Sequence, residues 1–255
     1  MRRILKEEVQ FNDSLGICLI QINSSRKWIG SHWISDVPVA HAVLTRVIKM
    51  VRGISDRDMG FPIKILEKFR HSILDTFKEQ RQKRIPFVGA KTLIHPPRSS
   101  ETGYRTWIVM RQPFMKSELH LKTEPLKIGD SIVWDERFII RMLPGQEYLD
   151  SQHNARQFTV TPFDKIHYDN VVHQLKNIKS KSDTKQMYIR ALGTYWGKMP
   201  PVGRSVIPCI LEENGRVVSV PSLGINMDPG IVRVDTEYLL SRDADEVPLH
   251  VSESI

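Results

Sequence analysis

The stretch Asp130–Leu143, DSIVWDERFIIRML, decides the fold class of this chain. It is rich in β-branched and aromatic residues and follows a turn at Gly129-Asp130, a pattern typical of a short antiparallel strand. Similar short runs, bounded by glycine, proline, aspartate or serine, occupy 85–94, 104–112 and 156–162. We therefore expect a small antiparallel sheet on both sides of this stretch.

Downstream of this region the pattern alternates between helix and strand. A helix is expected from about Pro162 to Ile178, with Ile166 and Leu175 facing inward, and a second one at roughly 183–193. The runs VIPCIL and RVVSVPSLGI then flank Asn214-Gly215, and an Asn-Gly pair between two β-rich runs predicts a hairpin. From Asp228 onward the chain is polar and acidic, so we expect a frayed tail.

Upstream, the pattern indicates one short strand at 15–22 and then two amphipathic helices. The first helix is capped by Ser35 or Asp36 and has apolar residues at helical spacing up to Gly53. The second begins near Pro62 and runs towards Arg84. The sequence thus predicts an α+β fold with a helical, basic region at 1–90, a β-rich domain with helices at 91–227, and an acidic frayed tail at 228–255.

Composition and charge narrow the class of protein. The 255 residues are 40% hydrophobic and 26% charged, which excludes a disordered chain, and no apolar run reaches the length of about 18 residues that a membrane span needs. Two cysteines are too few for a disulfide scaffold, so we expect an intracellular protein. The net charge is +8, with 18 Lys and Arg against 9 Asp and Glu in residues 1–100, and this asymmetry favours a polyanionic partner.

The sequence contains no complete catalytic motif. There is no HExxH zinc motif, no GxSxG nucleophile elbow and no GxxxxGK[ST] phosphate loop. Gly129-Asp130-Ser131 matches the end of an SGGxDS phosphate loop, but Lys127-Ile128 stands where the leading glycines would be. We therefore expect a turn at this point, and no catalytic residue, resident metal or cofactor in this chain.

Two segments, SIVWDERFII at Ser131–Ile140 and MPPVGRSVIP at Met199–Pro208 with the run Arg216–Ile225 after it, together resemble the tRNA(Ile)-lysidine synthetase family. Ser131–Ile140 is similar to the WDgRF strand of the region that follows the catalytic domain in that family. Met199–Pro208, followed by Arg216–Ile225, is similar to the family's C-terminal iPpwxRdxiPlly…lvaVpglgv hairpin. Val202-Gly203 and Ser222 depart from this pattern. The order and separation of the motifs make the resemblance more specific than either motif alone.

The resemblance implies that catalysis and tRNA recognition belong to different parts of the enzyme. Family members carry a PP-loop domain with SGGxDS, which uses ATP and Mg²⁺ to activate the wobble cytidine of tRNA(Ile) before lysine attacks its C2. This sequence has no such motif, so the chain is expected to be the tRNA-recognition portion and to be inactive alone. The implied partners are tRNA(Ile) and a PP-loop domain or chain. The implied location is the mitochondrion in a eukaryote or the cytoplasm in a bacterium.

Basic side chains are the candidate RNA contacts, since they neutralise backbone phosphates. Arg137 and Arg204 are expected to make defined contacts because a guanidinium can grip phosphate with two parallel hydrogen bonds. For Arg137 the alternative is an ion pair with Asp135 or Glu136, and for Arg204 it is a bond to nearby hairpin carbonyls. Trp134 and Trp196 either stack on bases or pack in the core. Five further residues on the two predicted helices are expected to hold the RNA backbone: Arg46, Lys49, Arg52, Lys64 and Lys68.

Two other function classes fit the same sequence. A general RNA-binding module would use the same basic faces without a role in modification. A protein-interaction domain would dock an acidic partner on them. Competition between tRNA(Ile) and unrelated duplex RNA separates the tRNA-recognition function from the general module.

Overall fold

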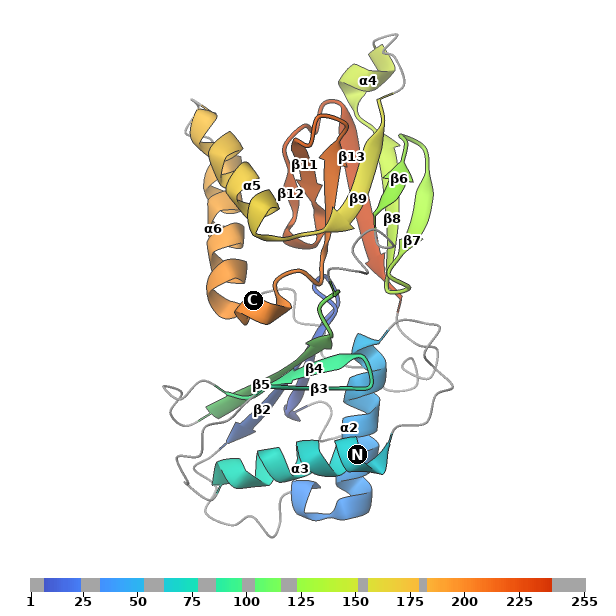
Figure 1. The fold of residues 1–255 in the computed structure, drawn as a ribbon. Coiled ribbons are helices and arrows are strands. Elements are labelled where there is room, and N and C mark those ends of the chain that lie inside the picture. Colours follow the sequence, from blue (N-terminus) through green and yellow to red (C-terminus); the bar gives the residue numbers. More distant parts are fainter. Residues whose placement is uncertain are drawn as a thin grey trace. The chain divides into compact units, whose positions relative to one another are not determined.

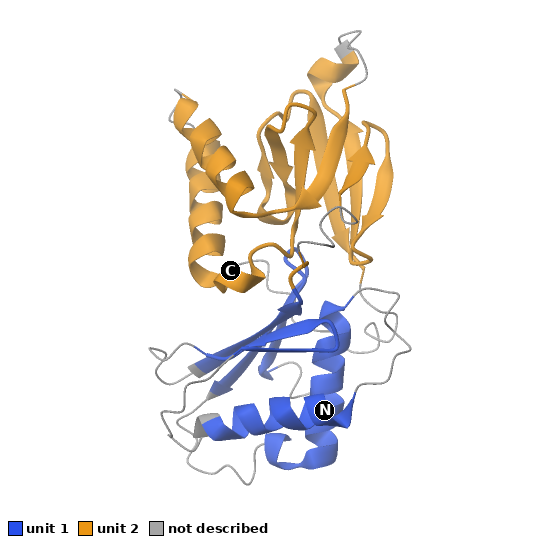
Figure 2. Cartoon of the chain, in the orientation of Figure 1, with its two compact units in different colours: residues 1–112, 240–254 blue, residues 113–239, 255 orange. Residues whose placement is uncertain are grey.

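The computed structural model describes residues 7–23, 33–52, 62–77, 86–97, 104–115, 123–150, 156–178 and 183–239. These residues fall into two compact units, divided between Gln112 and Pro113 (Figure 2). Both units combine helices with antiparallel sheets, so the predicted α+β class is confirmed.

Unit 1 contains a five-stranded antiparallel sheet in the order β1-β2-β5-β4-β3. The central pair is β2 and β5, which match residue for residue from Ile17 opposite Met110 to Asn23 opposite Tyr104. The strands are β1 (Val9–Asn12), β2 (Ile17–Asn23), β3 (Phe87–Gly89), β4 (Thr92–His95) and β5 (Tyr104–Arg111).

Two helices, α2 (Val37–Val51) and α3 (Ile63–Phe77), pack with this sheet (Figure 1). A short 3-10 turn, η2 (Trp33–Ser35), precedes α2. Asp36 caps α2, because its Oδ1 accepts a hydrogen bond from the backbone N–H of Val39 at 3.1 Å. Helix α2 contacts β2 and β5 as well as α3, which explains why seven of its 15 residues are apolar and buried.

Unit 2 contains two antiparallel sheets. The larger has the order β12-β11-β10-β9-β6 and the smaller the order β13-β8-β7, and together they enclose a core that includes Trp134, Phe138 and Phe158. The strands are β6 (Glu124–Leu126), β7 (Ser131–Trp134), β8 (Phe138–Pro144), β9 (Phe158–Pro162), β10 (Pro208–Glu212), β11 (Val217–Val220), β12 (Ile225–Asn226) and β13 (Val232–Tyr238).

Helices α5 (Lys165–Asn177) and α6 (Asp183–Lys198) lie side by side next to the larger sheet, where α5 contacts β11 (Figure 1). All four residues of β11 are buried, as expected for a strand covered on both faces. The short elements of unit 2 are α4 (Gln146–Asp150), η5 (Pro201–Gly203) and η6 (Pro221–Leu223). No described helix has the length and apolar character that crossing a membrane requires.

The structure differs from the predicted boundaries in three places. The described part of residues 1–90 is not purely helical, because it also contains β1, β2 and β3, which form one sheet with β4 and β5, and the units divide after Gln112 rather than after residue 90. The stretch Asp130–Leu143 forms a hairpin of β7 and β8, not a single strand. The predicted frayed tail contains β13, which pairs along its whole length with β8, because alternate residues such as Val232 reach the core. Residues 240–255 of that tail and the end of the second helix near Arg84 lie outside the described residues.

Candidate nucleic-acid interface

The basic residues predicted on the first helix do not form an exposed face. Arg46 and Lys49 are half-buried on α2, and Arg52, just past its C-terminus, is 5% exposed. Helix α2 contacts both the sheet and α3, so the face that carries these residues is partly covered. A side chain as buried as Arg52 offers little surface to an RNA phosphate, so the structure gives no support to its predicted role as a backbone contact.

The basic residues predicted on the second helix are exposed. Lys64 and Lys68 lie on the outer side of α3, and the Nζ of Lys68 sits 4.6 Å from the centre of the Phe87 ring on β3. Gly89 lies so close to α3 that an added Cβ would stand 2.8 Å from the Cγ2 of Ile65. The β3–β4 hairpin therefore packs directly against α3.

This packing adds a lysine that sequence reasoning missed. Lys91 is exposed in the β3–β4 turn, where both Ala90 and Lys91 have positive φ, at 51° and 56°. A two-residue turn with two positive φ values is the type that joins twisted strands. We call Lys64, Lys68 and Lys91 the α3–hairpin surface. The signal in the sequence was the Gly-Ala-Lys turn within an otherwise apolar run.

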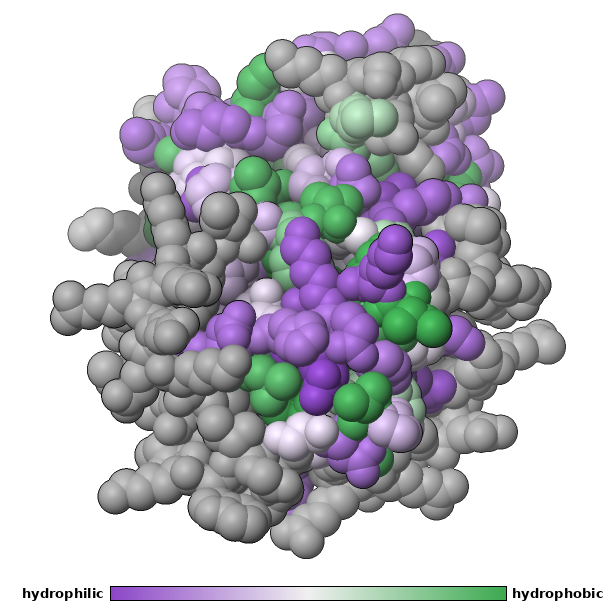
Figure 3. Space-filling model, turned by 60° about the horizontal axis from the view of Figure 1, so that its bottom comes forward, coloured by the Kyte–Doolittle hydropathy of each residue, from purple (hydrophilic) through white to green (hydrophobic). Residues whose placement is uncertain are grey.

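Isolated apolar side chains are exposed on α3 and on the neighbouring β3. Figure 3 turns the lower side of Figure 1 forward and shows a band of hydrophilic side chains interrupted by small hydrophobic areas. Ile63 at the start of α3 is 67% exposed and Val88 on β3 is 51% exposed. Such single exposed apolar residues are common on protein surfaces. The positive charge of the three exposed lysines is suited to phosphate.

The one acid near the middle of α3 is already engaged within unit 1. One carboxylate oxygen of Glu67 lies 2.8 Å from His41 Nε2 on α2, and the other lies 3.3 Å from both Arg70 and His71. Partial removal from water raises the pKa of the Glu67 carboxyl, but the hydrogen bond and charge of His41 and the charge of Arg70 outweigh it and hold that pKa below its ordinary value. Arg70 also donates to the carbonyl of Ile34 at 2.9 Å. This cluster ties α3 to α2 and η2.

Arg137 is a structural residue in the hairpin of β7 and β8. Its side chain is fully buried, its Nε donates to Asp135 Oδ2 at 2.7 Å, and its Nη2 donates to the carbonyl of Val206 at 2.6 Å. Asp135 and Glu136 form the turn with φ values of 50° and 59°. The ion-pair alternative is therefore the one observed, and the buried guanidinium of Arg137 offers no exposed surface for the predicted RNA contact.

Arg204 lies beside an aromatic pair and is half-buried. Its Cζ stands 4.6 Å from the centre of the Trp196 ring, and Trp196 stacks on Tyr168 with ring centres 4.2 Å apart. The Nζ of Lys165 lies 4.9 Å from the Tyr168 ring. The hydrogen bond from Arg204 Nε to the Met199 carbonyl is long, at 3.4 Å, so the carbonyl alternative engages only one edge of the guanidinium.

The start of α5 fixes Tyr168 in this cluster. Asp164 accepts a hydrogen bond from the backbone N–H of His167 at 3.0 Å, and the ring Nδ1 of His167 accepts one from the backbone N–H of Asp164 at 3.2 Å. Burial lowers the pKa of His167, against the opposing effect of Asp164, and so favours the neutral ring that this second bond requires.

The two tryptophans that were candidates for base stacking differ in burial. Trp196 is half-buried, whereas Trp134 is fully buried in the core between the two sheets.

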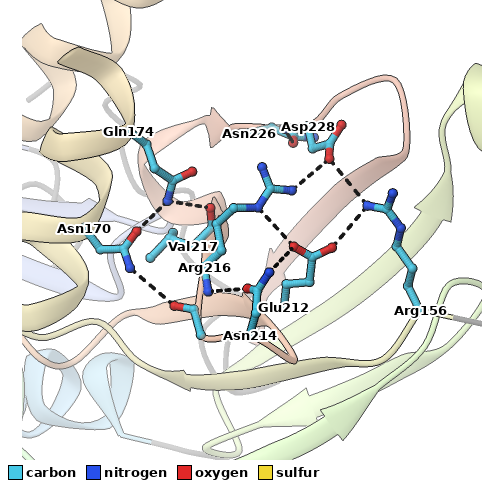
Figure 4. Close-up of polar contacts among 10 residues, drawn as sticks. Arg156, Asn170, Gln174, Glu212, Asn214, Arg216, Val217, Asn226 and Asp228 are labelled. Carbon is cyan, nitrogen blue, oxygen red and sulfur yellow. Dashed lines mark hydrogen bonds and ion pairs between the residues drawn. The ribbon is translucent and has the colours of Figure 1, made fainter. Parts of the chain in front are cut away.

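The hairpin of β10 and β11 is held by a polar network whose charges cancel (Figure 4). Arg216 binds Glu212 and Asp228, each at 3.0 Å, and Arg156 binds the same two carboxylates at 3.1 and 3.7 Å. Partial burial lowers the pKa of Arg216, but the hydrogen bonds to both carboxylates outweigh it and raise that pKa above its ordinary value. Two cations facing two anions stabilise the Asn-Gly turn and offer no excess charge to RNA.

Among the described residues, the turn at Gly129 and the two cysteines have contacts and burial that fit structural roles. Lys127 N–H donates to Asp130 Oδ2 at 2.9 Å, and Gly129 N–H donates to the Met142 carbonyl at 2.8 Å, so this turn does not fit a pyrophosphate. Burial raises the pKa of the Cys18 thiol and of the Cys209 thiol, which keeps both protonated. Within the described ranges, no group of three or more His, Cys, Asp or Glu side chains is arranged to hold a metal ion.

Comparison with known proteins adds one similarity. A scan against models of known protein families finds no match for the chain. Among curated proteins, the chain is similar to the "Probable tRNA(Ile)-lysidine synthase" of Schizosaccharomyces pombe, with 26% identity over 124 residues. The match covers 49% of this chain and 23% of that protein, so the chain spans about a quarter of the relative's length. The relative's name agrees with the family that the two sequence motifs resemble.

Proposed function

We propose that this chain is the tRNA-recognition part of a tRNA(Ile)-lysidine synthetase. The observation that carries the proposal is that the sequence motifs and the curated relative point to the same family. The WDERF and MPPVGRSVIP motifs resemble that family, and the yeast relative that the chain matches is named as a probable member. ATP, lysine and the PP-loop chemistry would then belong to residues outside this chain. The purified chain should accordingly incorporate no lysine into tRNA(Ile).

Two groups of side chains are suited to the RNA. The α3–hairpin surface offers three exposed ammonium groups, and each one that neutralises a phosphate releases counterions. Arg204 offers a guanidinium that is already oriented over Trp196. Such a side chain loses less conformational entropy on binding than a free lysine does. Arg46 and Lys49, half-buried on α2, remain predictions that we do not include in this contact set.

The test is the substitution Arg204→Lys, with Arg141→Lys as the matched control. Lysine keeps the charge but loses the planar fork, so affinity for tRNA(Ile) should fall by roughly 1–2 kcal/mol, while the melting temperature stays near that of wild type. Arg141 lies on β8 in an exposed ion pair with Glu237 at 2.7 Å, and its replacement should change neither quantity. If Arg204→Lys binds tRNA(Ile) as tightly as the control does, Arg204 is not an RNA contact.

A further inference from the structure

Arg137 joins the two segments that resemble the family. One segment supplies Arg137 and Asp135 in the β7–β8 turn, and the other supplies the Val206 carbonyl, 69 residues further along the chain. The guanidinium is fully buried and its Nη1 has no hydrogen-bond partner in the described part of the chain. A buried ion pair with an unsatisfied nitrogen contributes little net stability compared with apolar packing, so stability alone gives no reason for an arginine at this position.

The Val206 bond belongs to a clamp on the loop 199–207. Three carbonyls of this loop accept hydrogen bonds from three other parts of unit 2. Arg137 Nη2 donates to Val206 at 2.6 Å, the hydroxyl of Tyr195 on α6 donates to Arg204 at 2.7 Å, and the backbone N–H of Phe163 donates to Ile207 at 2.9 Å. These three hydrogen bonds restrict the conformation of the loop and so fix the position of the Arg204 backbone.

The clamp also sets where the Arg204 side chain points. Pro200 and Pro201 restrict the first part of the loop, and the backbone N–H of Gly203 donates to the Pro200 carbonyl at 2.8 Å. From this position the guanidinium of Arg204 reaches the Trp196 ring at 4.6 Å. A group fixed in this way before binding loses less entropy when it meets an anionic ligand.

We propose that Arg137 and Tyr195 are positioning residues: they fix the loop 199–207 so that Arg204 is presented to an RNA phosphate. This inference rests on the proposed function, since it assigns Arg204 to the RNA. Arg137 itself touches no ligand. Its effect on RNA passes through the Val206 carbonyl and the backbone of Arg204.

The experiment combines a local signal with RNA affinity. The full chain is labelled with 5-fluorotryptophan, and the fluorine resonance of Trp196 is assigned by its absence in Trp196→Phe. Arg137→Lys keeps a positive charge for Asp135 but cannot also reach the Val206 carbonyl. It should shift the Trp196 resonance and lower affinity for tRNA(Ile) roughly three- to tenfold, the equivalent of one hydrogen bond. Arg141→Lys on the same strand should do neither.

A double-mutant cycle shows whether Arg137 acts through Arg204. The double variant Arg137→Lys/Arg204→Lys should bind tRNA(Ile) no more weakly than Arg204→Lys alone, because the contact that Arg137 positions is already lost. Tyr195→Phe removes the second hydrogen bond of the clamp and should reproduce the Trp196 shift. It serves as the test if Arg137→Lys does not fold.

The two failures are distinguishable. An unmoved Trp196 resonance in both Arg137→Lys and Tyr195→Phe, or affinity losses that multiply in the double variant, would overturn the positioning role. If instead the resonance moves while Arg204→Lys leaves tRNA affinity unchanged, the clamp stands and the proposed RNA contact of Arg204 fails.

Discussion

Helices α2 and α3 carry similar basic patterns but present them differently. Arg46, Lys49 and Arg52 recur every three residues along the first, and Lys64 and Lys68 are four apart on the second. In the structure the first set is half-buried or buried, whereas both lysines of α3 are exposed. The difference arises because α2 contacts the sheet and α3 at once, so it has little outer surface.

The comparison shows why basic spacing alone is a poor guide to an RNA interface. Spacing tells which residues share one side of a helix, but the layers around that helix decide whether that side meets water. The apolar content of α2 indicates that little of this helix is exposed. Ala40, Val43, Leu44, Val47 and Ile48 form a broad apolar stripe, and Met50 and Val51 extend it. A helix with so wide an apolar surface is covered on more than one side.

The largest expected effect is on stability at the end of α2. Arg52→Ala removes a buried cation that interacts with other residues of the chain, so the free energy of unfolding should fall by about 2–4 kcal/mol in urea titrations. Lys64→Ala, at an exposed position of α3, should change it by less than about 0.5 kcal/mol. Equal losses for the two variants would remove the distinction between the helices.

The next largest effect is on RNA binding. Substitutions on α3 should weaken binding more than substitutions on α2, the reverse of the effect on stability. The pair Lys64→Gln/Lys68→Gln should weaken tRNA binding about tenfold and flatten the log–log salt dependence by about 1.4–1.8, which is 0.7–0.9 for each lost phosphate contact. The pair Arg46→Gln/Lys49→Gln removes the same charge from half-buried positions and should flatten it less. Filter binding across a salt series measures both slopes, and a steeper change for the α2 pair would contradict the exposure argument.

A smaller effect concerns the start of α2. Asp36→Ala removes the side chain that accepts the Val39 N–H, so unfolding free energy should drop by about 1 kcal/mol. Asp36→Asn should retain most of it because asparagine also caps helices well. Thermal denaturation of the three proteins side by side provides the measurement. A loss of equal size in Asp36→Asn would mean that the charge, and not the cap, matters there.

The smallest effect is the pH dependence of the cluster that joins the two helices. The folded-state pKa of Glu67 is lowered, so its contribution to stability is present above the ordinary carboxyl pKa and is lost as pH falls through the folded value. Glu67 faces His41 from α2 and both Arg70 and His71 from α3. The melting difference between wild type and Glu67→Gln should therefore be larger near neutrality than at acid pH. A difference that grows on acidification would reverse this assignment.

Much of the fold could be predicted from the spacing of apolar residues, with a period of two in strands and about 3.6 in helices. The errors in the prediction have definite causes. The hairpin at Asp135-Glu136 was not recognised as a turn because both residues adopt positive φ without being glycine. Ile166 was predicted to face inward but is 74% exposed, because α5 begins at Lys165 and only later residues such as Val171 and Leu175 face the core. The strand β13 was missed since its polar residues alternate on an exposed face.

The candidate site was less predictable than the fold. That Arg137 pairs with Asp135 was one of two open alternatives, and only its burial decides between them. Lys91 joins Lys64 and Lys68 through the packing of a hairpin on a helix, which no local pattern contains. The stack of Tyr168 on Trp196 unites residues of two helices, and so depends on how α5 and α6 pack.

Competition binding tests the central claim most directly. The chain is bound to labelled tRNA(Ile) at moderate salt, and unlabelled tRNA(Ile) or an unrelated RNA duplex of equal phosphate content is added. Because recognition of one folded tRNA depends on its shape as well as on phosphates, tRNA(Ile) should displace the label at a concentration about ten times lower than the duplex requires. Equal displacement by the two RNAs would contradict a tRNA-recognition role and leave a general RNA-binding module in its place.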